Sequence, residues 1–397
     1  MKPTPTRPVI ALQPVPFGIP LLRLGFRPFY LAAALCAVGL MLAWYGVFFG
    51  RIVPRTGLAP VLWHAHEMLF GFVAAVIVGF LFTAGKSWTN LATPRGALLG
   101  WLVALWASAR VASVAAPYPA FFFLDVAFLP LVAALFLDLL VRARNRRNLP
   151  IAAILILLSL GNLGFHLAAT GVIAVEPMRF LHAGIALVIV LESLIAGRVV
   201  PMFTMNATPG LKLRDHRHRD AIAIALSALG LALWACDVAP RASAVALAIA
   251  ALLHFARLLS WSPRASLGRP ILWILQFSYA WIPTGLALLG AAQAGMLGAS
   301  AGVHALTVGS MGGLTIGMMT RTARGHTGRP LEASRIEVAA YVLLLAAAAT
   351  RVLAPFLAGL YVSALTLAGA LWCAAFTGYL IKFAPWLATT RADGRDG

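Results

Sequence analysis

Long runs of apolar residues recur along the whole chain, separated by short polar stretches rich in proline and glycine. A run of about twenty apolar residues matches a helix that crosses a bilayer, whereas the strands of a membrane barrel are about half as long and alternate in polarity. The pattern therefore predicts an all-α fold, a polytopic helical membrane protein of about twelve transmembrane helices. The predicted segments are approximately 28–49, 67–83, 96–114, 120–141, 150–172, 179–200, 220–236, 242–259, 270–290, 299–319, 336–354 and 358–383.

The composition supports a membrane protein and argues against a soluble one. Hydrophobic residues make up 61% of the chain and charged residues 11%, with a mean hydropathy of +0.89. Soluble domains carry about a quarter charged residues. Cys36, Cys236 and Cys373 lie in or beside apolar runs and form no CxxC pair, which indicates neither a disulfide framework nor a zinc site.

The distribution of positive charge predicts the orientation in the membrane. When the connections are numbered alternately, one side holds 25 of the 31 lysines and arginines and the other side holds 6. Because cytoplasmic loops carry the excess of these residues, both termini are predicted to be cytoplasmic, in a bacterial inner membrane. The net charge of +19 is then a topology signal and a contact with anionic membrane lipids, and nucleic acid is not an expected partner.

The chain is predicted to contain a single twelve-span domain over residues 26–385. Residues 1–25 contain six prolines and lack an apolar core, which predicts a disordered cytoplasmic tail without a cleavable signal. Residues 386–397 are predicted to form a cytoplasmic C-terminal tail.

Five of the nine histidines fall at one depth near the outer membrane face. His64 and His66 open the second span, and the others lie within about six residues of the outer ends of their spans. At about 1.5 Å per helical residue, all five lie within about 10 Å of the outer boundary. The other three are His166, His182 and His304 on the fifth, sixth and tenth spans.

A layer of imidazoles from four helices predicts a metal site. Ionisable residues inside membranes are rare and tend to face the bundle interior, and neutral imidazole is a common ligand for iron and copper. Glu67 lies three residues after His64, so on a helix it shares a face with His64 and is a candidate second-shell partner that orients the His64 ring. His64 and His66 are two positions apart and would diverge by about 200° on a helix, so they need not share an ion. Each histidine could instead be a cap or a hydrogen-bonded core residue.

Four motifs resemble those of the NnrS family, membrane proteins that contain haem and copper and are associated with nitric oxide metabolism and nitrosative stress. The motifs are GFRPFY (Gly25 to Tyr30), WHAHEMLFGF (Trp63 to Phe72), GRVVPMFTMNAT (Gly197 to Thr208) and a long one from His304 to Leu331. The resemblance extends over nearly the whole chain. It implies haem b, copper and nitric oxide as a partner.

The resemblance suggests an assignment of the histidines. We expect a haem held by His64 or His66 together with His304, and copper or a second metal among His166, His182 and the remaining histidine of the second span. Arg27, Arg110 or Arg51 would pair with the haem propionates, with Arg27 the weakest because it lies at the inner face.

Histidines on the second, sixth and tenth spans also resemble subunit I of the haem-copper oxidases and nitric oxide reductases at the level of the fold. The tenth span carries one histidine where those proteins carry a pair. An oxidoreductase resembling nitric oxide reductase, served by an unknown electron donor, is therefore one interpretation. A secondary transporter, or a sensor or metal-delivery protein without turnover, is the alternative.

Overall fold

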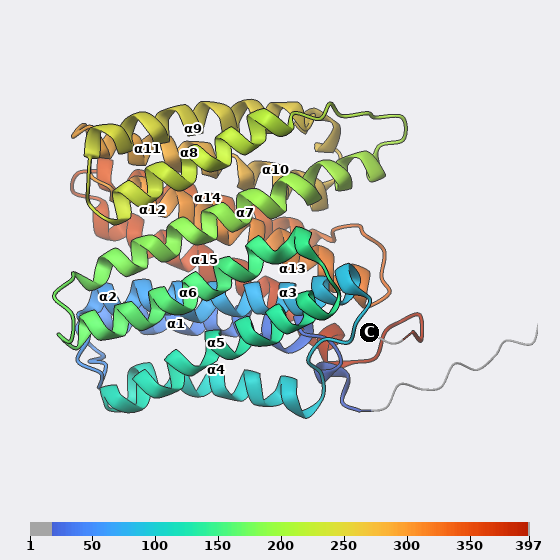
Figure 1. The fold of residues 1–397 in the computed structure, drawn as a ribbon, viewed down its shortest axis with the longest axis horizontal. Helices are drawn as coiled ribbons and strands as arrows, with labels where there is room; N and C mark the ends of the chain where they lie inside the picture. Colours follow the sequence, from blue (N-terminus) through green and yellow to red (C-terminus); the bar gives the residue numbers. More distant parts are fainter. Residues whose placement is uncertain (1–17, 396–397) are drawn as a thin grey trace, which may run out of the picture.

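The computed structural model describes residues 18–395, which are helical apart from turns and connections. The long helices lie side by side along the horizontal axis of Figure 1. They are α1 (Phe26–Phe48), α4 (Ala97–Ala115), α5 (Tyr118–Arg142), α6 (Leu149–Ala169), α7 (Pro177–Ala207), α8 (Arg217–Ala235), α9 (Pro240–Ser260), α10 (Pro270–Tyr279), α11 (Trp281–Gln293), α14 (Arg335–Leu353) and α15 (Tyr361–Ala388).

Two further helices are each built from three consecutive stretches. The second helix runs through α2 (Pro60–His66), η2 (Glu67–Val73) and α3 (Ala74–Thr89). The other runs through α12 (Ser300–His304), η5 (Ala305–Gly312) and α13 (Gly313–His326). In both, the middle stretch is a π-helix, a form that is rare and is frequently found at functional sites.

The structure confirms the predicted all-α polytopic fold. Within the described range, eleven helices are long and apolar enough to cross a membrane, judged by length and composition. Each coincides with one predicted segment. The remaining predicted segment, 299–319, coincides with α12–η5–α13, whose π-helical stretch divides it into pieces. The protein is thus a multi-pass membrane protein.

Prolines that punctuate the sequence mark the beginnings of helices. Proline lacks the N–H group that the first turn of a helix leaves unpaired, so it is tolerated there. Helices α2, α7, α9 and α10 begin at Pro60, Pro177, Pro240 and Pro270. Helix α14 begins instead with a capping box, in which Ser334 and Glu337 each bond the other's backbone N–H.

The two helices with π-helical stretches lie in the interior of the bundle. The most apolar window of the second helix is 78% buried, the largest share among the eleven candidate spans. Helix α1 packs against α3 and α15, and η5 packs against α11 and α14. Helices α8 and α9 form an outer pair on one side, with α4 and α5 on the opposite side (Figure 1). The interior position of these two helices places their histidines away from lipid.

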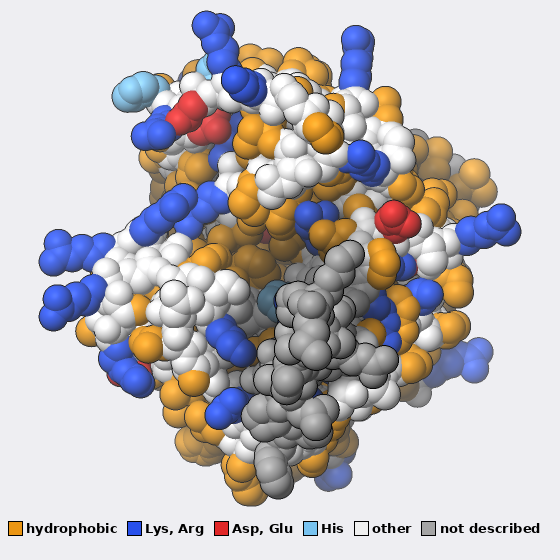
Figure 2. Space-filling model, turned by 90° about the vertical axis from the view of Figure 1, so that its right-hand side faces the viewer, with side chains coloured by type: hydrophobic (Ala, Val, Ile, Leu, Met, Phe, Trp, Pro, Cys, Tyr) orange, Lys and Arg blue, Asp and Glu red, His pale blue; other side chains and the backbone are white. Residues whose placement is uncertain are grey.

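One end of the bundle carries most of the positive charge and both ends of the described chain. We call this end the basic face; it is viewed directly in Figure 2, where Lys and Arg side chains project around its rim. The stretches α2 and α12, which carry His64, His66 and His304, lie at the opposite end (Figure 1). The assignment of the basic face to the cytoplasm remains a prediction from charge.

The structure describes only part of the two predicted tails. Residues 1–17 and 396–397 lie outside the described residues, and residues 18–25 include a short 3₁₀ helix, Pro20–Leu22. At the other end, α15 continues to Ala388. Arg27 donates hydrogen bonds to the carbonyls of Leu387 (2.9 Å) and Thr389 (2.7 Å), which ties the start of α1 to the end of α15.

Candidate functional site

The second helix directs its two histidines to different places. His64 lines a cavity, whereas His66 is fully buried in a polar cluster. Because they are two positions apart on a helix, their side chains leave it in nearly opposite directions. The structure therefore divides the five predicted histidines into two groups: His64, His182 and His304 share the cavity, while His66 and His166 share the cluster.

The first group lines a cavity of about 330 Å³, which lies among α1, α2, η2, α7, α12, η5, α14 and α15. We call it the histidine cavity. Its remaining walls are mostly apolar and include Trp44, Phe72 and Trp372. A cavity of about 150 Å³ already holds benzene, and cofactor sites begin at about 300 Å³. The histidine cavity is therefore large enough for a small cofactor or ligand.

A hydrogen bond to the backbone fixes the tautomer of His304. Its Nδ1 lies 2.8 Å from the carbonyl oxygen of Ser300, one turn earlier in α12. A carbonyl only accepts, so Nδ1 carries the proton and Nε2 retains its lone pair. This is the arrangement in which metal-bound histidines are commonly held.

Aromatic rings hold the other two imidazoles of the cavity. His64 stacks on Trp44 with ring centroids 4.3 Å apart, and His182 stacks on Trp234 at 4.0 Å. Within the described part of the chain, neither imidazole makes a hydrogen bond. The ring nitrogens of both histidines are therefore free to bind a ligand in the cavity.

Arg351 of α14 supplies the positive charge of the histidine cavity. Its Nη2 donates to the hydroxyl of Ser300 at 3.3 Å. Its Nη1 is buried without a hydrogen-bond partner among residues 18–395. An unpaired guanidinium nitrogen at the wall of a cavity is a site for an anionic group.

Four methionines bring thioethers to the same wall. Met68 lies in the π-helical stretch of the second helix, directly after Glu67, and Met311 lies in that of the tenth span. Thioether sulfur is a soft ligand that favours Cu(I), but methionine is also a common core residue. The four are Met41, Met68, Met178 and Met311.

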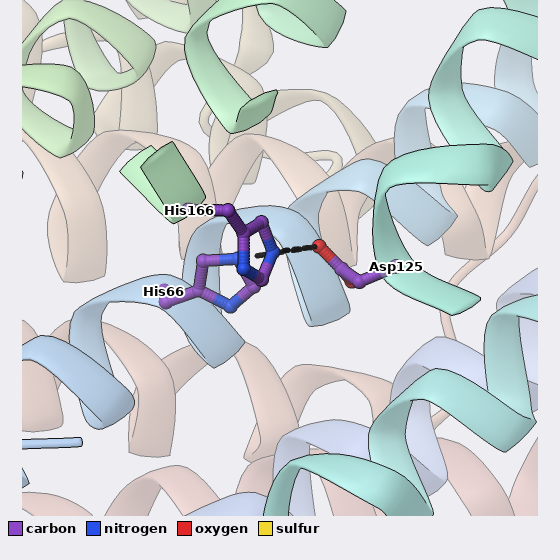
Figure 3. A group of neighbouring side chains, drawn as sticks. All are labelled: His66, Asp125 and His166. Atoms are coloured by element: carbon purple, nitrogen blue, oxygen red, sulfur yellow. Dashed lines mark hydrogen bonds and ion pairs between the residues drawn. The ribbon is translucent and has the colours of Figure 1, made fainter. Parts of the chain in front are cut away.

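The second group forms a buried cluster with a carboxylate. One nitrogen each of His66 and His166 and one oxygen of Asp125 lie within 4.8 Å of one another, and all three residues are buried (Figure 3). They come from α2, α6 and α5. Two imidazoles and one carboxylate are a donor set that suits a divalent transition metal.

Hydrogen bonds fix the protons of His166. Its Nε2 lies 3.1 Å from Asp125 Oδ2, and its Nδ1 lies 2.9 Å from the hydroxyl of Tyr118. Since the carboxylate accepts, Nε2 carries the proton and the Tyr118 hydroxyl donates to Nδ1. His166 is thus satisfied as a neutral imidazole.

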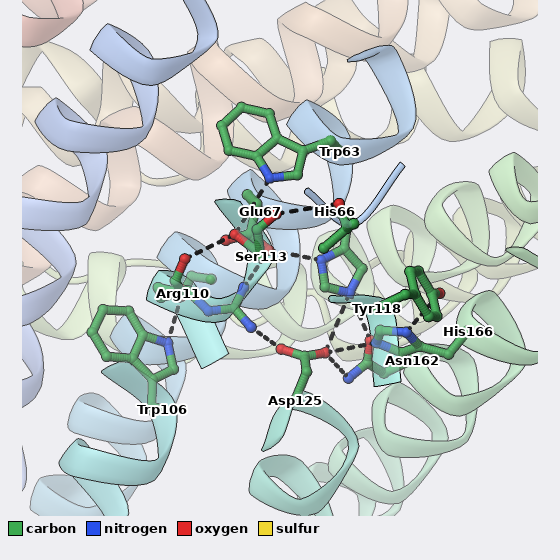
Figure 4. A network of polar contacts seen from close by, with 12 residues as sticks. Trp63, His66, Glu67, Trp106, Arg110, Ser113, Tyr118, Asp125, Asn162 and His166 are labelled. Atoms are coloured by element: carbon green, nitrogen blue, oxygen red, sulfur yellow. Dashed lines mark hydrogen bonds and ion pairs between the residues drawn. The ribbon is translucent and has the colours of Figure 1, made fainter. Parts of the chain in front are cut away.

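His66 differs, because both of its nitrogens face acceptors (Figure 4). Nδ1 lies 3.0 Å from Glu67 Oε1, and Nε2 lies 3.0 Å from Asn162 Oδ1. The Asn162 amide orientation is set by its Nδ2, which donates to Asp125 Oδ2 at 2.7 Å. Nδ1 of His66 therefore carries a proton that it donates to Glu67. Nε2 carries either a second proton or a metal ion.

Charge balance leads to the same requirement. Arg110 donates to Glu67 Oε1 at 2.8 Å and also pairs with Asp125. One guanidinium therefore faces two buried carboxylates. A net charge in the membrane interior is costly, so one further positive charge is needed at His66.

The three arginines that were predicted to pair with the haem propionates lie in three different places. Arg110 belongs to the buried cluster, and Arg27 binds backbone carbonyls near the basic face. Arg51 lies exposed in the connection after α1. None of the three lines the histidine cavity, whereas Arg351 does.

Sequence reasoning missed Arg351 and the carboxylate of the cluster. Arg351 is one of the six basic residues on the sparsely charged side, and it stands at the end of an apolar run. These two signals could have identified it as a candidate site residue. Asp125 of α5 accepts a hydrogen bond from Asn162 of α6. Their association with His66 and His166 depends on helix rotation, which the sequence does not reveal.

The comparison with known protein families gives one match. A family model described as NnrS protein matches residues 20–391, nearly the whole chain. The search of curated proteins found no match. Because the family match covers far more than half of its length, this chain belongs to the NnrS family.

Proposed function

We propose that this protein binds haem b in the histidine cavity and copper, or a second metal, at the His66–Asp125–His166 cluster, and that it handles nitric oxide in the bacterial inner membrane. The main support is that three imidazoles from three helices line one mostly apolar cavity. Membership of the NnrS family is consistent with a role related to nitric oxide.

The residues of the histidine cavity fit a haem. His64 and His304 would hold the haem iron, because His304 presents a lone pair at Nε2 and the stacked ring of His64 makes no hydrogen bond within residues 18–395. The buried Nη1 of Arg351 fits a propionate. Apolar side chains would surround the porphyrin.

A haem held by these histidines would supply an iron that binds a diatomic ligand such as nitric oxide in exchange for one of the two imidazoles. The protein's own residues determine the setting. Trp44 fixes the ring plane of His64, and the Ser300 carbonyl fixes the tautomer of His304. The mostly apolar walls favour a small uncharged ligand that partitions from the bilayer.

The buried cluster fits a second metal for a separate reason. A metal ion at Nε2 of His66 would supply the positive charge that the hydrogen bonds and the two carboxylates require there. A ligating imidazole nitrogen is unprotonated. For Nε2 of His166 to hold the ion, the ring proton would sit on Nδ1 instead, and the Tyr118 hydroxyl would accept a hydrogen bond from it. Imidazole nitrogen suits copper, zinc and iron, so metal analysis must identify the ion.

The test is the absorption spectrum of detergent-purified protein, oxidised and reduced, with and without nitric oxide, together with iron and copper analysis. We expect a haem Soret band that shifts when nitric oxide binds. His304→Ala should lose the haem, while His218→Ala, an exposed residue near the basic face, should retain it. A His304→Ala protein with normal haem content would refute the axial assignment.

A parallel pair of variants tests the second metal. His166→Ala and Asp125→Asn should lower the copper content while the haem spectrum persists, because the two sites share no residue. Consumption of nitric oxide by the reduced wild-type protein would then distinguish an oxidoreductase from a sensor, which binds the gas without turnover.

A further inference from the structure

An acidic residue lies in the middle of the membrane, outside both histidine groups. Glu192 is halfway along α7, the helix that carries His182 near one end. Ionisable residues at this depth are costly to bury and commonly carry protons or bind substrates. None of the functions proposed above uses this carboxyl group.

Glu192 has a hydrogen-bond donor but no cation. Its Oε2 accepts a hydrogen bond from the hydroxyl of Ser310 at 2.7 Å, and none of the ion pairs among residues 18–395 includes it. An ionised carboxylate without a positive partner is strongly disfavoured in the membrane interior. The side chain is therefore expected to be protonated at rest.

The carboxyl group lies between two cavities. Glu192 lines a smaller cavity of about 90 Å³, which we call the inner cavity. Val73 lines both this cavity and the histidine cavity. The partner of Glu192, Ser310, lies in η5 directly before Met311, which lines the histidine cavity. Glu192 and Ser310 thus form a polar link between the two spaces.

The inner cavity has room for water and groups to bind it. One water occupies about 10–15 Å³ of such a volume, so about 90 Å³ accommodates several. Besides Glu192, the polar side chains of its lining are Tyr30 and Thr315. The buried hydroxyl of Tyr30 has Thr322 as a side-chain partner, and a hydroxyl group can make a further hydrogen bond to a water molecule.

Few other titratable groups face Glu192. Tyr30 of α1 is the other titratable residue of the inner cavity, and the lining residues from η2, α3, α10 and α13 include no acid, histidine, lysine or arginine. Ser310 is its contact from η5. No charged side chain of the inner cavity would therefore offset the change in charge when Glu192 gains or loses a proton.

We infer that Glu192 is a proton-binding site that passes protons between the inner cavity and the histidine cavity. The O–H bond of the carboxylic acid breaks as its proton moves to water on the side of Ser310. The carboxylate left behind then takes a proton from a hydronium ion in the inner cavity, which becomes neutral water, so one proton has passed from one cavity to the other. The use of this proton to reduce nitric oxide rests on the proposed function. The claim that Glu192 is protonated and exchanges its proton with water does not.

Infrared spectroscopy of the purified protein tests this inference directly. We expect a carbonyl stretch from a protonated carboxylic acid at neutral pH, which moves to lower frequency in D₂O and disappears in Glu192→Gln. The matched control is Glu176→Gln, at the exposed start of the same helix, which should leave the band unchanged. Ser310→Ala should keep the band and shift its frequency, because it removes the hydrogen bond to Oε2.

The outcomes separate the two proposals. If the band is absent from the wild type, survives in Glu192→Gln, or fails to respond to D₂O, the inference about Glu192 is wrong. The haem spectrum reports on the histidine cavity independently. Glu192→Gln should retain the Soret band and its response to nitric oxide, and slow only steps that consume protons.

Discussion

A buried histidine can coordinate a ligand only through a nitrogen that the protein has left available. His254 is fully buried, yet its Nδ1 lies 2.6 Å from the Tyr279 hydroxyl and its Nε2 lies 3.0 Å from the Ser227 hydroxyl. Both of its nitrogens are used inside the protein, so its role is structural. His304 uses only Nδ1, and its Nε2 remains for the cavity.

At the same scale, we predict that Arg351 strengthens haem binding. Hydrogen bonds to charged groups contribute about 1.5–3 kcal/mol, so Arg351→Gln should weaken haem affinity roughly 10- to 100-fold. Titration of the haem-free protein with haem, followed by absorbance, measures the change. Arg241→Gln, at an exposed position predicted on the same side of the membrane, is the control and should bind haem normally. Equal affinities for the two variants would contradict the assignment.

Two π-helical stretches, η2 and η5, border the candidate sites. Each begins directly after a histidine, His66 in one and His304 in the other. A π-helical stretch redirects side chains relative to a regular α-helix, so Met68 and Met311 line the histidine cavity from within these stretches. The glycines of η5 also allow close packing. A Cβ atom at Gly312 would lie 2.6 Å from the ring of Trp372 in α15.

This contact leads to a prediction about packing. Gly312→Ala should destabilise the protein by about 1–3 kcal/mol, as overpacked substitutions typically do, and should reduce haem content. Gly39→Ala in α1 is the matched control, because a Cβ there has no neighbour within 4 Å. It should be neutral or stabilising by about 0.5–1 kcal/mol, since alanine favours helix more than glycine does. Thermal unfolding in detergent compares the two; equal unfolding temperatures would contradict the role of Gly312.

The elements also show what the sequence can and cannot predict. Apolar runs located all twelve helices, because the cost of exposing a polar backbone to lipid leaves few alternatives. They underestimated the second helix, predicted over 67–83 and observed from Pro60 to Thr89, since its polar end carries the histidines. The π-helical stretches have no periodic signal. The rotation of each helix, which places His182 in the cavity with His304 and His166 with Asp125, is decided by packing between helices.

At the scale of the whole molecule, charge and chemistry occupy opposite ends. Lysine and arginine gather at the basic face (Figure 2), while α2 and α12 bring His64 and His304 to the other end (Figure 1). If the basic face is cytoplasmic, as the charge distribution predicts, both histidine groups lie in the periplasmic half of the membrane. A proton taken up through Glu192 would then come from the cytoplasmic half.

A native cysteine offers a test of this orientation. Cys236 is exposed in the connection between α8 and α9, whereas Cys36 is buried and Cys373 is partly buried within helices. We predict that a membrane-impermeant thiol reagent labels Cys236 in intact spheroplasts, and that Cys236→Ser abolishes the labelling. Labelling that occurs only after the membrane is broken would reverse the predicted orientation.

The shared position of His64 and His66 on one short helix has a thermodynamic consequence. Their side chains enter two separate sites from the same two turns of α2, so a rotation or shift of that helix changes the geometry of both sites. An ion that holds His66 in place biases the orientation available to His64, and the converse holds by linkage. If both proposed sites bind their ligands, a change in the affinity of one caused by occupancy of the other would be matched by the same factor in the opposite direction.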